Sequence, residues 1–161
     1  MQLPIQSQSR IYAERWEAGT GAAELGRVVE AAEAAGLFYV AVCDHVAVPR
    51  EPAERMSTIW YDTVATLAWI AGRTERVRLL SHVFVPAYRH PLVAAKAFLT
   101  LDELSGGRTI LGVGTGHVEG EFEALGADFT HRGAVTDEAI DVLRAAFTDE
   151  FPQYQGEHVT V

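Results

Sequence analysis

The sequence has few of the features of secreted, membrane-spanning or nucleic-acid-binding proteins. Its 161 residues include one cysteine, Cys43, so an internal disulfide framework is impossible. The 13 basic residues are outnumbered by 22 acidic ones, and the net charge of −9 disfavours nucleic acid and anionic membranes as partners. No apolar run approaches the roughly 20 residues of a membrane helix, and residues 1–5 do not begin a signal peptide. We therefore expect a soluble, cytoplasmic protein that binds neither nucleic acid nor membrane.

Several ligand-binding motifs are also missing. The Gly-x-Gly-x-x-Gly fingerprint of dinucleotide-binding folds fails, because Gly112 and Gly114 are followed by His117, and Gly114 and Gly116 by Glu119. There is no Gly-x-x-x-x-Gly-Lys phosphate loop, and no histidine pair has metal-binding spacing, so we expect no metal. A zinc or iron site, the minor alternative, would have to use Asp44, His45, His82 and His117.

What is present fits one globular domain spanning residues 1–161, with 48% hydrophobic residues. Hydrophobic periodicity predicts four strand-then-helix repeats. The expected strands are residues 1–6, 38–43, 77–85 and 109–113, and the expected helices are residues 22–35 and 62–72, one after Pro91, a short turn at 119–125 and one after Thr136. Alternating elements with buried strands predict a doubly wound sheet or a (β/α) barrel, and a complete barrel takes about 250 residues.

Finer expectations concern loops, caps and helix faces. Two prolines favour a loop over residues 45–57, and Thr136 is expected to cap the helix that follows it. Residues 151–161 resemble a hairpin or edge strand, and Arg108 is expected to pair with Asp102. The core face of the helix at 62–72 is expected to hold Tyr61, Val64, Ala65 and Ala68.

Polar and special residues follow the expected strands at their carboxyl ends, which converge on one mouth in a parallel barrel. Asp44 and His45 follow the second strand, and Arg89 lies just past the third. The fourth strand runs into Gly-Thr-Gly at residues 114–116, where missing side chains let the backbone approach a flat ring or a phosphate. The alternative is a tight strand-to-loop turn that binds nothing.

Five motifs in register carry a resemblance to a known family. They are GLFYVAVCDH at 36–45, LLSHVFVPAYRHP at 79–91, LDELSGGR at 101–108, GVGTG at 112–116 and EFEALG at 121–126. Together they cover nearly the whole chain and resemble the luciferase-like flavin and deazaflavin oxidoreductases. The resemblance implies an α/β fold of the TIM-barrel type, bacterial luciferase-like and incomplete, with about four βα units.

The family resemblance also implies a reaction and a site. It implies hydride transfer or monooxygenation on a small organic substrate, with coenzyme F-420, a deazaflavin, as the cofactor and FMN as second choice. His45 would transfer a proton or contact the substrate, and Asp44 would bind the ring's polar edge or fix the tautomer of His45. A bulge with a non-proline cis peptide is implied at 81–82 or 82–83. The residues implied to contact the ring are Ser81, His82, Val83, Gly114, Thr115, Gly116 and His117.

Two departures from the family pattern limit which properties of the family can be expected of this chain. His117 stands where sugar-phosphate-oxidising relatives carry a glutamate, which argues against their substrate and leaves a second acid or base unassigned. An incomplete barrel exposes apolar surface and strand edges, so a homodimer or other homo-oligomer is expected. The alternative function is a non-catalytic module that only binds cofactor or oligomerises.

Overall fold

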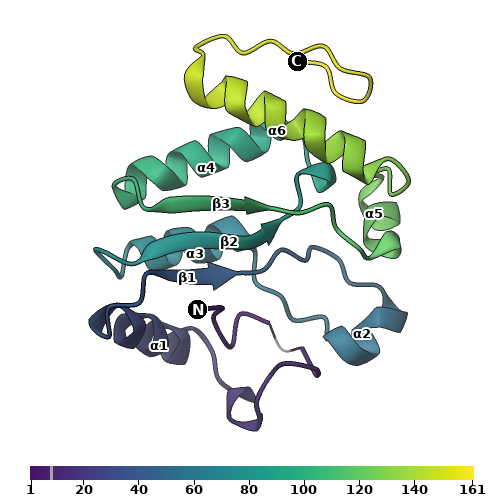
Figure 1. Cartoon of the computed structure of the whole chain (residues 1–161). Coiled ribbons are helices and arrows are strands. Elements are labelled where there is room, and N and C mark those ends of the chain that lie inside the picture. Colours follow the sequence, from purple (N-terminus) through teal and green to yellow (C-terminus); the bar gives the residue numbers. More distant parts are fainter. Residues whose placement is uncertain (8) are drawn as a thin grey trace.

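The computed structural model describes residues 1–7 and 9–161 and contains a parallel sheet flanked by helices (Figure 1). The strands are β1 (Tyr39–Val42), β2 (Arg78–Phe84) and β3 (Thr109–Val113), in the spatial order β1-β2-β3. The α-helices are α1 (Ala22–Ala34), α2 (Arg50–Met56), α3 (Thr63–Ala71), α4 (Pro91–Ser105), α5 (Glu119–Leu125) and α6 (Arg132–Thr148), with 3-10 turns η1 (Arg15–Glu17) and η2 (Pro86–Tyr88). Strand order therefore follows chain order with no reversal, as in a (β/α) barrel and unlike a doubly wound sheet.

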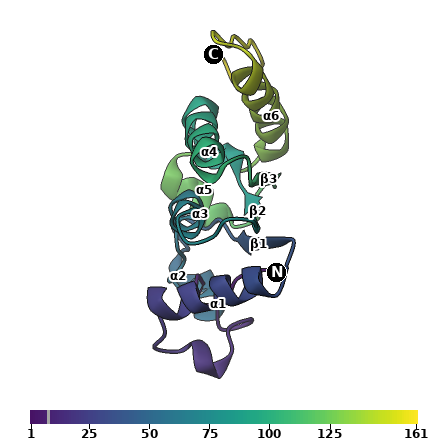
Figure 2. The ribbon, with the colours of Figure 1, turned by 90° about the vertical axis from the view of Figure 1, so that its left-hand side faces the viewer.

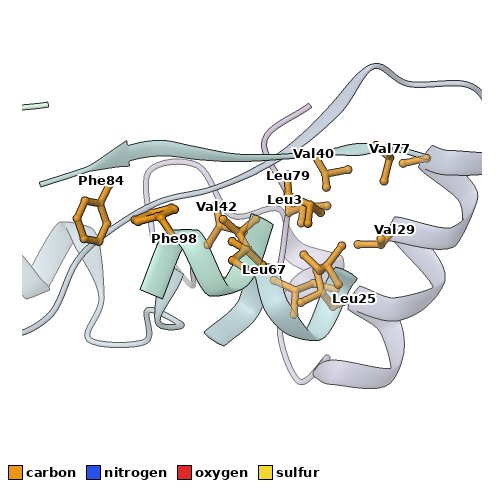
Figure 3. Packing of buried hydrophobic residues seen from close by; sticks show 14 of the residues in the cluster. Leu3, Leu25, Val29, Val40, Val42, Leu67, Val77, Leu79, Phe84 and Phe98 are labelled. Atoms are coloured by element: carbon orange, nitrogen blue, oxygen red, sulfur yellow. The ribbon is translucent and has the colours of Figure 1, made fainter. Parts of the chain in front are cut away.

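Helices α3 and α4 cover the same face of the sheet, as the turned view shows (Figure 2). Helix α4 also packs against α6. The core lies between these helices and the strands, where Val42, Leu67, Leu79 and Phe98 are each at most 2% exposed (Figure 3). The opposite face of β3 is only partly covered, and all five of its residues are of intermediate burial. The sheet thus has a packed outer face and a more open inner face, the arrangement expected of part of a barrel.

The first expected strand is reduced to one bridge. Gln2 pairs in parallel with Ala41, and Ala41 exchanges backbone hydrogen bonds with Met1 and Leu3. Pro4 has no N–H to donate, and Ile5 has a φ of +72°, which an extended strand cannot hold. The segment therefore joins the β1 edge briefly and then turns toward the carboxyl ends of the strands.

The loop predicted over residues 45–57 is wrong, because it contains α2. Pro49 is the N-cap, and Pro52 falls in the first turn, where a backbone N–H has no intrahelical acceptor. The following residues, Ala53 to Met56, are strong helix formers. Both prolines are therefore compatible with a short helix.

Two expectations about other helices are also wrong. Helix α6 starts at Arg132 with His131 as its N-cap, so Thr136 lies inside the helix and is buried. The helix begins a turn earlier because Val135 packs on the cluster around Phe122. In α3 the buried residues are Thr63, Thr66, Leu67 and Ile70. Of the predicted face, Tyr61 and Val64 pack partly buried against the core, whereas Ala65 and Ala68 are exposed.

Arg108 does not pair with Asp102. Its guanidinium donates to the backbone carbonyls of Ala71, Thr74, Val77 and Ser105 at 2.7–3.0 Å and to the Thr74 hydroxyl at 2.8 Å. The Asp102 carboxylate instead accepts the Thr109 N–H at 3.1 Å. Carbonyls at the ends of neighbouring elements satisfy the buried arginine as well as a carboxylate would.

The end of the chain forms the hairpin-like turn that the sequence predicts. Tyr154 and Val161 exchange two backbone hydrogen bonds of 2.8 Å, and Gln155 bridges Thr160. Glu138 of α6 accepts three successive N–H groups of this turn, at residues 157–159. These contacts hold the turn against α6, above which Figure 1 shows it.

Candidate functional site

A pocket of about 480 Å³ lies at the carboxyl ends of the three strands. Its walls come from the residues after β1, from the end of β2, from the loop after β3 and from the N-terminal segment. The predicted site residues that line it are Asp44, His45, His82, Val83, Gly114, Thr115, Gly116 and His117. Its volume is in the range that holds a drug-sized ligand, roughly 300–1,000 Å³. The fold therefore brings together all of the predicted site residues except Ser81.

His45 is held by a buried carboxylate from α5. Its Nδ1 lies 2.9 Å from Oε2 of Glu121, whose side chain is fully buried. Burial raises the pKa of Glu121, but hydrogen bonds from His45 and from the amides of Ala47 and Val46 outweigh it, so that the pKa lies below its usual range. The carboxylate is therefore ionised at neutral pH and acts only as an acceptor.

Asp44 has a different environment from the one predicted. Its carboxylate accepts two hydrogen bonds of 2.7 Å from the Arg89 guanidinium and one of 2.9 Å from the Val85 N–H. The Thr63 hydroxyl donates a fourth at 3.2 Å. The expectation that Asp44 fixes the tautomer of His45 is wrong, because Glu121 is the partner of that ring. Asp44 instead ties the end of β1 to the end of β2.

Strand β2 carries an irregularity at the pocket wall. Its pairing with β3 shifts register between Ser81 and Phe84, and the His82–Val83 peptide is cis, at one of the two predicted bonds. His82 and Val83 face the pocket. Ser81 does not: it is buried, and its hydroxyl donates to the Gly112 carbonyl and accepts the Gly112 N–H, at 2.9 and 3.0 Å. Ser81 therefore braces the sheet behind the pocket and does not line it.

The glycines after β3 are required by packing. A side chain at Gly114 would meet the Val83 methyl at 2.5 Å. Gly116 has a φ of +76°, and a side chain there would lie 2.9 Å from the Phe122 ring. The glycines thus let the loop pass close to β2 and α5, where Gly114 and Gly116 themselves line the pocket.

Further pocket residues supply rings and a thiol. The Trp60 ring lies 4.3 Å from that of His45, and the His117 ring lies 5.8 Å from it, edge to face. Trp60 borders the pocket, whereas Tyr61 packs against the core. Burial raises the pKa of the Cys43 thiol, against hydrogen bonds from Gln6 and Gln2, so this cysteine is a poor nucleophile at neutral pH. Within residues 1–7 and 9–161, no three His, Cys, Asp or Glu side chains are grouped to hold a metal.

A larger hollow of about 560 Å³ lies elsewhere, on the outer faces of α3 and α4. Its lining is apolar apart from Lys96 and Thr100, and it contains no histidine or carboxylate. Its polar groups are one amine and one hydroxyl, and it offers no pair of an acid or base with an orienting partner like His45 and Glu121. The chemistry therefore belongs to the smaller pocket at the strand ends.

Sequence reasoning did not assign roles to Glu121 and Tyr88. Glu121 is one of three glutamates between residues 119 and 123, and only its position on the inner side of α5 distinguishes it. Tyr88 sits in η2 and donates its hydroxyl to Glu121 at 3.2 Å. The one local signal was the apolar neighbour Phe122 in an otherwise acidic turn, and it does not identify the partner of Glu121.

Comparison with known proteins gives a consistent assignment. Residues 1–161 match the family model described as luciferase-like monooxygenase. An F-420-dependent glucose-6-phosphate dehydrogenase from Segniliparus rotundus is 33% identical in an alignment 163 residues long. The alignment covers 98% of this chain and 46% of the relative. The chain thus spans about half the length of that relative.

Solved structures agree on the fold. A monooxygenase from Streptomyces bottropensis superposes with a TM-score of 0.80 at 24% identity, covering 99% of this chain and 46% of its own. The oxygenating constituent of 3,6-diketocamphane monooxygenase from Pseudomonas putida, in complex with FMN, gives a TM-score of 0.71 at 15% identity, covering 89% of this chain and 40% of its own. At these identities the match shows a shared fold and nothing about ligands.

Proposed function

The chain belongs to the luciferase-like monooxygenase family, and on that premise we propose that its pocket binds the ring of coenzyme F-420 in an oxidoreductase that acts on a small organic molecule. The observation that carries this proposal is the meeting of His45, the His82–Val83 bulge and the loop at residues 114–117 in one pocket. F-420 is the first choice because a 33% identical relative is named for it. FMN is the second choice, since the neighbour that binds it is only 15% identical.

The pocket residues fit a planar ring with a polar edge. Val83, which is 39% exposed, offers an apolar surface for one face of the ring. Thr115 supplies a hydroxyl, and the peptide groups at 114–117 supply further polar contacts at the rim. Such a ring, when bound, supplies hydride chemistry. The protein's own part is to place His45 beside it and to hold or move the proton that accompanies the hydride.

We do not propose glucose 6-phosphate, the substrate in the name of the 33% identical relative, as the substrate of this chain. His117 stands where the family pattern for sugar-phosphate oxidation has a glutamate, and its ring packs edge to face against His45 at 5.8 Å. A carboxylate and an imidazole differ in charge and in hydrogen-bonding capacity. We therefore propose a small organic substrate other than a sugar phosphate.

The proposed function is tested by titrating the purified protein with F-420 and with FMN in separate experiments. We expect saturable uptake, visible as a shift of the ring's absorbance band, with tighter binding of F-420. Thr115→Trp should block uptake because it places an indole in the pocket. Thr130→Trp, at an exposed threonine outside the pocket, is the matched control and should bind normally. Saturable uptake of neither ring would refute the proposal and leave the non-catalytic module.

We also propose that the chain forms a homodimer through the outer face of α3 and α4. This face carries the apolar hollow, with Val93 64% and Leu104 73% exposed. Lys96 and Glu103 lie seven residues apart on α4, about 10 Å along its axis. A two-fold axis that packs α4 antiparallel against its copy would set each Lys96 opposite the other Glu103. The pairing of opposite charges around an apolar centre favours a second copy of this chain as the occupant.

Light scattering checks the dimer. Leu104→Glu should convert a dimer into a monomer, because it places a charge in the apolar contact. Phe151→Glu removes another exposed apolar side chain, 80% exposed and outside the α3–α4 hollow, and should leave the dimer intact. A well-behaved monomer of the unmodified protein would refute this part of the proposal.

We also propose a cytoplasmic location for the protein. It is supported by the single cysteine, since proteins of oxidising compartments commonly carry paired cysteines. Across the described part of the chain, no helix is both long and apolar enough to cross a membrane.

A further inference from the structure

Glu121 lies on α5 with its side chain fully buried, directly behind the histidine that faces the pocket. We propose that Glu121 is a positioning residue that fixes His45 in one orientation and one tautomer, with the proton on Nδ1 and the lone pair on Nε2. This inference rests on the proposed function for its catalytic meaning. Its structural content, the tautomer of His45, can be measured without any cofactor.

Four donors converge on the Glu121 carboxylate and fix its position. Oε1 accepts the N–H groups of Val46 and Ala47, at 2.5 and 3.0 Å. Oε2 accepts the Tyr88 hydroxyl at 3.2 Å and lies 2.9 Å from Nδ1 of His45. A carboxylate bound on both oxygens has little freedom to rotate, so the direction of its contact to His45 is set by the backbone of residues 46 and 47.

The charges of these groups determine which atom holds the proton. Hydrogen bonds from His45 and the two amides overcome the effect of burial and keep the pKa of Glu121 low, so the carboxylate carries no proton to donate. Burial, and then the negative charge of Glu121, raise the pKa of Tyr88, so the phenol stays protonated and donates. A close contact between an ionised carboxylate and an imidazole nitrogen requires a proton on that nitrogen. His45 therefore donates from Nδ1.

The tautomer leaves Nε2 as a proton acceptor. Nε2 lies across the ring from the Nδ1 contact, and the ring lines the pocket between Trp60 and His117. When a substrate hydroxyl gives its proton to Nε2, the O–H bond breaks, its electron pair stays on oxygen and an N–H bond forms. The hydride lost from the adjacent carbon would pass to the proposed deazaflavin, so both electrons and the proton are accounted for. The positive charge that develops on the ring is stabilised by Glu121, 2.9 Å away.

The resulting design is the general one in which a buried carboxylate orients a catalytic imidazole. In this chain the carboxylate and the histidine are 76 residues apart in sequence. The Glu121 side chain does not line the pocket. Helix α5 therefore contributes to the proposed chemistry only through the contact of Glu121 with His45.

The tautomer is measured by long-range ¹H–¹⁵N correlation of the histidine rings at neutral to mildly alkaline pH, on the ¹⁵N-labelled protein. In the unmodified protein we expect a protonated Nδ1 and an unprotonated Nε2 for His45. In Glu121→Gln we expect the Nδ1-protonated population to fall, toward the Nε2-protonated form that free imidazole side chains prefer. Asp128→Asn, which alters the exposed His131–Asp128 pair of 2.6 Å, is the matched control and should leave the His45 signals unchanged.

A functional readout accompanies the spectra. Glu121→Gln should lower the rate at which small alcohols bleach bound F-420 by about 10- to 100-fold, the range seen when the hydrogen-bonded partner of a metal-bound histidine is removed, while F-420 affinity stays close to that of the unmodified protein. An Nε2-protonated His45 in the unmodified protein would overturn the inference even if the variant fails to fold, and so would an unchanged tautomer in a folded variant. Neither result would contradict the proposal that the pocket binds F-420. Conversely, failed uptake of the ring would refute the proposed function but would not affect the measured tautomer of His45.

Discussion

Replacing Asp44 with asparagine is expected to lower the free energy of unfolding by about 3–5 kcal/mol, the cost typical of breaking a buried ion pair. The Asp44 side chain is 2% exposed and the Arg89 side chain 23% exposed, and two hydrogen bonds of 2.7 Å join them. An asparagine amide would direct a donor at the guanidinium and leave a partly buried positive charge without its partner. Urea denaturation of the two proteins measures the loss.

The control for this prediction is Asp141→Asn on α6. Asp141 pairs with Arg144 at 3.3 Å, and both side chains are more than half exposed. Exposed pairs of this kind contribute at most about 1 kcal/mol. An Asp44→Asn variant as stable as Asp141→Asn would show that the pair does not hold β1 to β2 and would reopen a chemical role for Asp44.

Replacing His45 with alanine is expected to lower turnover by about 10²- to 10⁴-fold, the contribution typical of a positioned acid or base. His45 is the pocket residue whose ring is fixed by a buried carboxylate, so its removal leaves no oriented proton acceptor at that place. Ring uptake should remain largely intact, because the bulge at 82–83 and the loop at 114–117 are unaffected. Turnover is followed as bleaching of the bound F-420 on addition of small alcohols.

His131, an exposed histidine, provides the comparison. His131 also contacts a carboxylate, but its side chain is 57% exposed and lies outside the pocket. His131→Ala should therefore turn over at the normal rate. Unchanged turnover in His45→Ala would remove His45 from the proposed chemistry, and lost uptake would make it a binding residue instead.

Much of the fold is readable from local pattern. Strand β3 and helix α5 have the predicted boundaries, and Pro91 begins α4 as expected, because short apolar runs, glycine stops and an N1 proline act within a few residues. The errors arise where tertiary contacts decide. Helix α6 gains a turn through Val135 packing near Phe122, and α3 is apolar on more than one side, so its pattern does not say which side is buried.

The sequence predicts which residues gather at the candidate site, because the carboxyl ends of parallel strands converge there. His45 and Thr115 line one pocket because each closely follows a parallel strand, and Val83 lines it from the last residues of β2. The direction of each side chain does not follow from sequence position. Asp44 turns to Arg89, and Ser81 turns to the backbone of Gly112, because each satisfies a buried polar group there.

The central claim is that a planar redox ring binds beside His45 at the strand ends. Methyl and amide NMR during titration with F-420 tests it most directly, because an aromatic ring shifts the signals of the nuclei it covers. The claim predicts the largest shifts at the methyl groups of Val83 and the amides of Thr115 to His117. Largest shifts at Val64 and Leu104, in the apolar hollow on α3 and α4, or no shifts at saturating cofactor, would contradict it.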